Sequence, residues 1–301
     1  MEGIPMTYNG TIYKPPTEAN TFLIPITEGC THNSCHFCNM YQNIPFRMLP
    51  LSEVEKFLQI VKNSYRKYCE QIRRVYLVGA DPFALSVKNL LERIDLIREY
   101  LPNAAVFTMY ARTDNIASKS DEDLVRLKEA GVDDLYIGVE CGLNDVLEYL
   151  NKGYSADETE KQCIRLNTAG IRHCDLLMLG TAGKGRGLEC ARASAALENR
   201  IKPHKILINT MSAFVETKLD DDIKKGYFLP ATEKENLEEE REFLAGLELP
   251  DCYFWALHPL DSVKLDGILQ EEKQQMLDAL AWSIANVNEN AINRTSRVGT
   301  L

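Results

Sequence analysis

Three cysteines that lie close together in the sequence have the clearest capacity for chemistry. Cys30, Cys35 and Cys38 fall within nine residues, directly after an apolar, β-leaning run over 21–26. Residues 29–39 carry no long apolar periodicity, so we expect a loop that presents sulfur atoms. Thiolates at this spacing converge on one metal centre, with zinc or an iron–sulfur cluster as the expected occupant. Three protein ligands leave a four-coordinate site one ligand short.

Composition limits the class of protein and its surroundings. Of the 301 residues, 26% are charged and 45% are hydrophobic, and no stretch has the length and apolarity of a membrane span or a signal peptide. We therefore expect a cytoplasmic protein with no membrane partner. The formal net charge of −10 argues against broad nucleic-acid binding, because such binding depends on neutralising phosphates.

The other cysteines show no paired spacing, which disfavours a disulfide framework and favours a reducing compartment. We expect most of them to be buried small residues. They are Cys69, Cys141, Cys163, Cys174, Cys190 and Cys252.

Strands and helices alternate along the first two thirds of the chain. Two Ala-Gly helix stops, at 130–131 and 169–170, are each followed by an apolar strand. The pattern predicts six βα units, a parallel sheet and an α/β fold, namely an open, partial (β/α)6 TIM-like barrel with a C-terminal extension. No Gly-x-Gly-x-x-Gly follows the first strand, so a dinucleotide-binding fold is disfavoured. The expected strands are 21–26, 75–78, 104–110, 135–139, 174–179 and 205–211.

The same patterns predict the domain boundaries and two helix starts. We expect an N-terminal arm over 1–20, the barrel over 21–215, and the C-terminal extension over 216–301. Ser52 with Glu55, and Ser155 with Glu158, have the spacing of capping boxes. The expected extension consists of an acidic helix over 233–247, a strand over 252–257 and a last helix over 270–287.

Polar and glycine residues follow the predicted strands or, like Asp175 and Asn209, lie on them, and a parallel sheet collects its functional groups at the carboxyl ends of its strands. Carboxylates, an arginine, a lysine and bare backbone together suit a zwitterionic ligand that carries a ribose and a base. These residues are Gly79, Ala80, Asp81, Arg112, Thr113, Glu140, Cys141, Lys152, Asp175 and Asn209.

The Cys-x4-Cys-x2-Cys loop, with Phe37 just before its last cysteine, resembles the cluster loop of radical S-adenosylmethionine (radical SAM) enzymes. That family's usual spacing is Cys-x3-Cys-x2-Cys, so this chain has one extra residue in the first gap. The segment from Leu135, reading Leu-Tyr-Ile-Gly-Val-Glu and later Asn-Lys-Gly-Tyr, is similar to the same superfamily. Its resemblance is closest to the oxygen-independent coproporphyrinogen oxidase-like branch.

The resemblance implies two cofactors and a type of reaction. Cys30, Cys35 and Cys38 would hold a 4Fe–4S cluster, and S-adenosylmethionine would bind the fourth iron. One electron would cleave S-adenosylmethionine to a 5′-deoxyadenosyl radical, which abstracts hydrogen from a small-molecule or short peptide substrate. An electron donor such as flavodoxin or ferredoxin, and an oxygen-avoiding setting, are implied with it.

The resemblance also implies contacts to S-adenosylmethionine. Gly79, Ala80 and Asp81 match a Gly-Gly-Glu-Pro segment that binds the methionine amino group, although two of the residues differ here. Phe37 matches the aromatic residue that approaches the adenine. Asn209 closes the sixth strand at the same rim. Contacts to the ribose and the methionine carboxylate are implied for Arg112 or Thr113, and for Glu140, Lys152 and Asp175.

Several residues near the expected barrel mouth are candidates for roles beyond cofactor binding. Cys141 is placed either to donate a hydrogen atom to a substrate radical or to pack as a small buried residue. His258 precedes Pro259 after the last strand, where the related branch often has a histidine within His-x-Ser-Asn, although this chain has Asp261 at the asparagine position; His258 is a candidate for contact with substrate. Arg294 and Arg297 would suit a carboxylate- or phosphate-bearing substrate if the tail folds back over the mouth.

Alternatives remain at several points. The cysteine loop would also suit a zinc knuckle with His32 or His36 as the fourth ligand. The chain would then be a zinc- or cluster-binding interaction module without radical chemistry. Within radical chemistry, the alternative is a coproporphyrinogen oxidase-like or haem-handling protein. At single positions, Asp81 would cap the turn before Pro82, Arg112 would form a structural ion pair, and Lys152 would be a solvated cation at a helix end.

Overall fold

The computed structural model describes residue 8 and residues 11–287, and it divides the chain into two compact units. The first unit comprises the described residues within Met1–Asn33, Tyr41–Ile137 and Arg165–His173. The second comprises those within Ser34–Met40, Gly138–Ile164 and Cys174–Leu301. Each unit is described by itself below.

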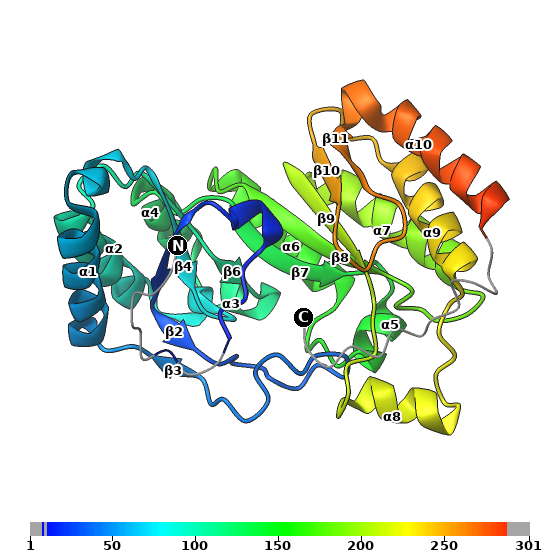
Figure 1. Cartoon of the computed structure of the whole chain (residues 1–301), viewed down its shortest axis with the longest axis horizontal. Helices are drawn as coiled ribbons and strands as arrows, with labels where there is room; N and C mark the ends of the chain where they lie inside the picture. Colours follow the sequence, from blue (N-terminus) through cyan, green and yellow to red (C-terminus); the bar gives the residue numbers. More distant parts are fainter. Residues whose placement is uncertain (1–7, 9–10, 288–301) are drawn as a thin grey trace. The chain divides into compact units, whose positions relative to one another are not determined.

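The first unit is built from short parallel strands with helices after them (Figure 1). One sheet has the order β1-β4-β5, β2 pairs antiparallel with β3, and β6 pairs with the start of β7. Helix α1 packs on α2, and α2 on α4. The elements are η1 (Pro16–Glu18), β1 (Phe22–Pro25), β2 (Thr27–Glu28), β3 (Arg47–Met48), α1 (Leu51–Tyr65), η2 (Arg66–Gln71), β4 (Arg74–Val78), η3 (Pro82–Ala84), α2 (Val87–Tyr100), β5 (Val106–Thr108), β6 (Tyr110–Ala111), α3 (Thr113–Ala117), α4 (Asp121–Glu129) and the first half of β7 (Leu135–Glu140).

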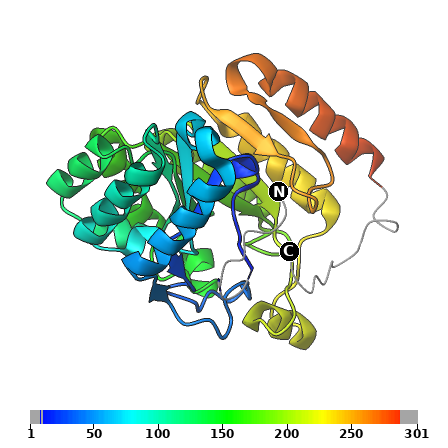
Figure 2. The same cartoon turned by 60° about the vertical axis from the view of Figure 1, so that its left-hand side comes forward.

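In the second unit, strands β8, β9 and β10 are parallel, and β11 adds an antiparallel edge. Helices α7, α9 and α10 lie side by side in Figures 1 and 2, with α9 in contact with both others. The elements after β7 are α5 (Asn144–Tyr149), α6 (Ala156–Thr168), β8 (His173–Leu179), α7 (Gly187–Ile201), β9 (Lys205–Thr210), α8 (Lys218–Lys225), α9 (Glu233–Gly246), β10 (Tyr253–Ala256), β11 (Leu265–Ile268) and α10 (Leu269–Asn286). The last four residues of α6 and the first residue of β8 belong to the first unit.

Most predicted elements are present, and the departures have local causes. The single strand expected over 104–110 is two strands, because β5 pairs with β4 whereas β6 pairs with β7. The capping box at Ser52 and Glu55 was wrong, since α1 begins at Leu51 with Pro50 at the N-cap and no side-chain cap. The box at Ser155 and Glu158 is confirmed, because each residue's backbone N–H donates to the other's side chain.

Among the strands and α-helices, five short elements were not predicted. Strands β2, β3 and β11 and helix α3 each span five residues or fewer, too short for a clear hydrophobic period. Helix α8 is short and strongly charged. No helix among the described residues has both the length and the apolarity needed to cross a membrane.

Candidate cofactor site

Exposure separates the three loop cysteines from the other six. Cys30, Cys35 and Cys38 are half-buried, whereas the other six cysteines are buried, as the sequence predicted. All nine lie within the described residues, and none forms a disulfide. The thiols that solvent or a ligand can reach are therefore those of the loop.

Cys30 belongs to the first unit, in a turn shaped by two left-handed residues. Gly29 has φ +69°, and a Cβ there would lie 2.5 Å from the carbonyl oxygen of Pro45. Asn33 has φ +44°; its backbone N–H donates to Cys30 Sγ at 3.5 Å, and its side-chain amide donates to the Tyr41 carbonyl at 2.8 Å. Asn33 lies in the lengthened gap between the first two cysteines, and the left-handed region favours asparagine over most other residues.

Asp81 connects the turn after β4 to the residue that follows Cys30. It is fully buried, and one of its oxygens accepts hydrogen bonds from the hydroxyl of Thr31 and from Asn115 Nδ2. Burial raises the pKa of Asp81 to about 7, although the Thr31 hydrogen bond and Arg112 oppose the rise. Its side chain does not cap the turn at Pro82. The second oxygen, Oδ1, is buried without a hydrogen-bond donor among the described residues.

The neighbouring predicted residues have clear local roles. Gly79 must be glycine, because a Cβ would lie 1.9 Å from Thr27 Oγ1, and Ala80 follows it half-buried. Arg112 forms a two-pronged ion pair with Asp114, with both N–O distances 3.1 Å, which is the structural pair considered from the sequence. Thr113 is buried as the first residue of α3.

Cys35 and Cys38 belong to the second unit, in a segment fixed to the end of α5. The backbone N–H of His36 donates to the Leu150 carbonyl at 2.9 Å, and His36 Nδ1 contacts the Tyr149 carbonyl. Asn151 Nδ2 donates to the Ser34 carbonyl at 2.7 Å. These contacts hold the second half of the cysteine loop in place without using its sulfur atoms.

A buried ion pair closes β7. Lys152 Nζ lies 2.7 Å from Glu140 Oε1, and both residues are buried. Glu140 has φ +65°, a costly backbone conformation for a residue other than glycine. A Cβ at Gly138 would lie 2.6 Å from Glu140 Oε1, so the pair occupies space that only a glycine leaves. The buried pair depends on residues 138, 140 and 152 together. It excludes the alternative considered from the sequence, in which Lys152 is a solvated cation at a helix end.

Lys152 also faces the cysteine segment of its own unit. Its ammonium lies 5.9 Å from the centre of the Phe37 ring and 5.3 Å from that of Tyr154. Burial would lower the pKa of Lys152, but Glu140, Tyr154 and Cys35 raise it well above its usual value. The lysine is therefore charged and lies close to Cys35, where a positive charge would stabilise the thiolate form of that cysteine.

Three other predicted residues of the second unit lie in different surroundings. Asn209 is half-buried near the end of β9, as expected. Asp175 lies in the first half of β8, fully buried near Glu198 of α7, rather than at the end of its strand. Cys141 is buried beside Cys190 of α7, which favours packing, and its role as a hydrogen donor stays a prediction.

The substrate residues predicted from the sequence are described only in part. His258 follows β10, and its Nδ1 accepts the Leu260 backbone N–H at 3.3 Å. Burial and Lys264 lower the pKa of His258, so its imidazole is neutral near pH 7. Asp261 accepts the backbone N–H of both His258 and Thr210. Arg294 and Arg297 lie outside the described residues.

Several residues that support these groups were given no role from the sequence. Thr31 and Asn115 bind Asp81, Gly138 makes room for the Glu140 pair, and Tyr154 donates its hydroxyl to the Gly138 carbonyl at 2.8 Å. Only the glycine inside an apolar strand gave a signal, since such a glycine often marks a close approach. The others became recognisable only through contacts between distant parts of the chain.

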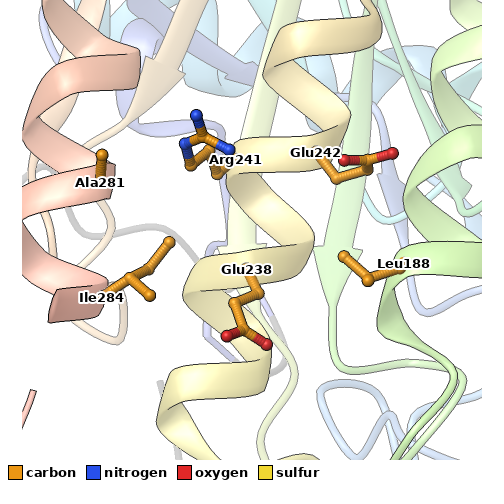
Figure 3. Close-up of a pocket in the computed structure, with 6 residues that line it drawn as sticks. All are labelled: Leu188, Glu238, Arg241, Glu242, Ala281 and Ile284. Atoms are coloured by element: carbon orange, nitrogen blue, oxygen red, sulfur yellow. The ribbon is translucent and has the colours of Figure 1, made fainter.

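A surface hollow of about 440 Å³ lies elsewhere in the second unit, on helices α7, α9 and α10. Figure 3 shows three charged α9 side chains between apolar residues of the flanking helices. The hollow has no predicted site residue in its lining. Its lining residues are Leu188, Glu238, Arg241, Glu242, Ala281 and Ile284.

A comparison with known families confirms the resemblance drawn from the sequence. The radical SAM superfamily profile matches residues 24–183, just over half of the chain. The chain therefore belongs to the radical SAM superfamily. A curated relative, the heme chaperone HemW of Bacillus subtilis (strain 168), is 27% identical over 158 residues. That match covers 52% of this chain and 41% of the relative, so this chain spans less than half of that protein's length.

Solved structures show the same fold at low identity. TsrM from Kitasatospora setae, a radical S-adenosylmethionine methyltransferase, has a TM-score of 0.54 and 16% identity over 68% of this chain and 39% of that chain. Elp3 from Methanocaldococcus infernus has a TM-score of 0.54 and 15% identity, and the match covers 86% of this chain and 62% of that chain. Methylornithine synthase (PylB) has a TM-score of 0.53 and 14% identity, and the match covers 91% of this chain and 85% of that chain. The expected α/β, partial-barrel class of fold is confirmed.

The cofactors of this superfamily are a 4Fe–4S cluster and S-adenosylmethionine, and the donor set of this chain fits them. The loop thiols are the accessible ones, and three thiolates are one ligand fewer than a four-iron cluster has corners. Asp81 offers an oxygen that has no hydrogen-bond donor within the described part of the chain, and Glu140 and Lys152 offer charges of both signs. These features suit a ligand with an amino group, a carboxylate and hydroxyls.

Proposed function

We propose that this chain is a radical SAM enzyme in which Cys30, Cys35 and Cys38 bind the 4Fe–4S cluster. Once loaded, the cluster and S-adenosylmethionine would supply a 5′-deoxyadenosyl radical that abstracts hydrogen from a small molecule or short peptide. The observation that carries the proposal is the exposure of these three thiols in one loop, while every other cysteine is buried.

The chain's own residues would position the ligands and control charge. Asp81 holds Thr31, the neighbour of Cys30, and keeps one oxygen for the methionine amino group. Lys152 lies near Cys35 and Phe37, where it would offset thiolate charge and orient a carboxylate. Glu140 would accept hydrogen bonds from ribose hydroxyls through its second oxygen. Phe37 would contact the adenine, and Gly79, Ala80, Thr113 and Asn209 would make further contacts to S-adenosylmethionine.

Asp175 and Arg112 have a smaller part in this proposal than their sequence positions implied. Asp175 is enclosed near Glu198, and the guanidinium of Arg112 is paired with Asp114. His258, a neutral imidazole whose Nδ1 is an acceptor, would present Nε2–H to a substrate acceptor atom. We place the protein in the cytoplasm of an oxygen-avoiding cell, with flavodoxin or ferredoxin as electron donor.

Anaerobic reconstitution tests the proposal. The purified chain, supplied with iron and sulfide, should bind about four irons and release 5′-deoxyadenosine from S-adenosylmethionine under reductant. Replacing the three loop cysteines together by alanine should abolish both, whereas Cys69→Ala, at a buried cysteine of η2, should preserve both. A chain that binds zinc at the loop and no iron would instead be the interaction module.

A haem-handling role is the second candidate, and the HemW relative is the observation that favours it. Haem titration followed by the Soret band, with and without the reconstituted cluster, distinguishes the two. Stoichiometric haem binding together with no 5′-deoxyadenosine release would favour this candidate over hydrogen abstraction.

A further inference from the structure

An exposed apolar corner follows helix α8 in the second unit. Tyr227 has 78% of its surface exposed and Leu229 has 62%, whereas Phe228 between them is buried. Backbone hydrogen bonds fix this alternation, because the N–H groups of Tyr227 and Phe228 both donate to the Asp222 carbonyl, at 2.8 and 3.2 Å. The Leu229 carbonyl accepts the N–H of Lys184 at 2.8 Å. Two large apolar side chains held outward by a fixed backbone form a preorganised contact surface.

The corner is connected to the cysteine segment of the same unit. The N–H of Leu219 in α8 donates to the His36 carbonyl at 2.9 Å. The buried ring of Phe228 stacks on Tyr149, with centroids 5.4 Å apart, and the Tyr149 ring lies 6.0 Å from that of His36. In Figure 1, α8 stands apart from the three helices that pack together in this unit. Two ring contacts therefore separate the exposed corner from the residue that follows Cys35.

The charge at this corner is opposite in sign to that of the whole chain. Each aspartate of α8 lies within ion-pair distance of a lysine of the same helix. Lys184 and Lys225 are exposed and have no ion pair in the described part of the chain. Lys184 and α8 together hold four lysines against three aspartates, a charge of +1, whereas the chain carries −10.

These charges distinguish between possible partners. Opposite charges steer two proteins together and set their orientation, so the corner favours an acidic partner. In a two-fold dimer of this chain, the same lysines would face each other, which like charges disfavour. The interfaces of electron-transfer proteins are small and transient, and two apolar side chains beside lysines suit such an interface.

We propose that the α8 corner, namely Lys184, Lys225, Tyr227 and Leu229, is the docking surface for a small acidic protein that carries one electron. The inference rests on the proposed function, since the chain needs such a carrier only if its loop holds a cluster. The reduced carrier loses one electron, the cluster site gains it, and no atom is transferred. Electron transfer slows steeply with distance, so a surface joined to the cysteine segment is the favourable place for the carrier.

Binding to the cofactor-free full chain tests the proposal without any turnover. Flavodoxin and ferredoxin are immobilised separately, and at least one should bind the wild-type chain, more weakly as salt is added. The triple variant Lys225→Glu, Tyr227→Ser, Leu229→Ser should raise the Kd at least about tenfold. Lys67→Glu with Tyr68→Ser, at an exposed lysine and tyrosine of η2 in the first unit, is the matched control and should bind as the wild type does.

Turnover with two kinds of reductant gives a second readout. After reconstitution, the triple variant should release 5′-deoxyadenosine at the wild-type rate with dithionite, a small reductant that needs no docking surface. With the reduced carrier protein, the KM for the carrier should rise at least about tenfold. An equal loss with both reductants would show that the corner supports the cysteine segment rather than a partner, and the proposal would be wrong.

The remaining outcomes are also decisive. Failure of both carriers to bind the wild-type chain, or equal binding by the triple variant, would overturn the proposal. Self-association of the wild-type chain that the triple variant abolishes, measured by analytical ultracentrifugation, would assign the corner to a second copy instead. If no reductant releases 5′-deoxyadenosine from the wild-type protein, the proposed function fails, and the binding measurement on the cofactor-free chain still decides whether the corner docks a carrier.

Discussion

Asp81 in the first unit and Glu140 in the second are both buried carboxylates that follow a strand, but different partners neutralise them. Asp81 accepts hydrogen bonds from the uncharged groups of Thr31 and Asn115, and its pKa rises to about 7. Glu140 pairs with the ammonium of Lys152 at 2.7 Å. Neutral donors leave a buried carboxylate able to take up a proton near neutral pH, whereas a buried cation fixes its charge.

The two arrangements also differ in what they fix. Asp81 ties together residues 31, 81 and 115, so its hydrogen bonds set the path of the chain next to Cys30. The Glu140–Lys152 pair joins residues only twelve positions apart, and Glu140 itself has a left-handed backbone. Strain of this kind persists where surrounding contacts hold it and is common at functional sites. The first arrangement is a structural support that can titrate, and the second is a fixed pair of charges.

Breaking the fixed pair should have the largest effect. Lys152→Met leaves Glu140 buried without its cation, so we expect a loss of about 3–5 kcal/mol in the free energy of unfolding. Urea denaturation of the cofactor-free chain measures it. The double variant with Glu140→Gln should recover at least half of the loss, because no lone charge remains. A loss below about 1 kcal/mol for Lys152→Met would mean that the pair is solvated.

Removing the charge of Asp81 should change how stability depends on pH. Its folded pKa, about 7, is above its unfolded value of 3.8, so its contribution is fully present below pH 4 and is lost as pH rises toward 7. Relative to Asp81→Asn, the wild-type chain should lose up to about 4 kcal/mol across that window. Denaturation at several pH values measures the difference. Asp95→Asn, at an exposed α2 carboxylate, should leave the profile unchanged, and parallel profiles for Asp81→Asn and wild type would contradict the assignment.

Deleting one neutral donor should have a smaller effect. Thr31→Val removes a hydrogen bond to Asp81 but leaves Asn115 in place, so we expect a loss of about 1–3 kcal/mol. Thr31→Ser keeps the hydroxyl and is the control. In the reconstituted protein, Thr31→Val should also hold its iron less tightly under a chelator. Equal iron retention in the two variants would show that Asp81 does not position the Cys30 turn.

The extra residue of the cysteine loop should show the smallest effect when glycine replaces it. Asn33→Gly relieves a left-handed backbone while removing one hydrogen bond, so stability should change by less than about 1 kcal/mol. Asn33→Val should cost more, because a β-branched residue is strained at that φ. Iron content after reconstitution of both variants measures the effect on the loop. An intact cluster loop in Asn33→Val would show that the left-handed turn is dispensable.

Much of the fold was predictable because its signals are local. The cap at Ser155 and the helix stops after residues 130 and 169 lie within one or two helical turns of the helix ends that they determine. The break at Met109 was not predictable, because it depends on which strands β5 and β6 pair with. Ser52 and Glu55 have the spacing of a capping box, but the box does not form because Pro50 is the N-cap and the helix begins at Leu51, two residues before it would begin with Ser52 as the cap.

The candidate site, like the fold, was predictable where its signals are local in the sequence. The cysteines and Glu140 were recognisable from spacing and from their place after apolar strands. That Asp175 lies near Glu198 was not, because only the packing of α7 on β8 brings the two carboxyl groups together. The supporting roles of Thr31 and Asn115 likewise depend on contacts across 50 and 34 residues.

The amino-acid sequence by itself determined the ligand chemistry and the succession of elements, because residue type, cysteine spacing and hydrophobic period act over a few residues. Tertiary structure alone decided which carboxylate meets a cation, which meets neutral donors and which meets another carboxylate. The reason is that the ionisation of a buried group depends on burial and on partners distant in sequence, and those are fixed only when strands and helices pack.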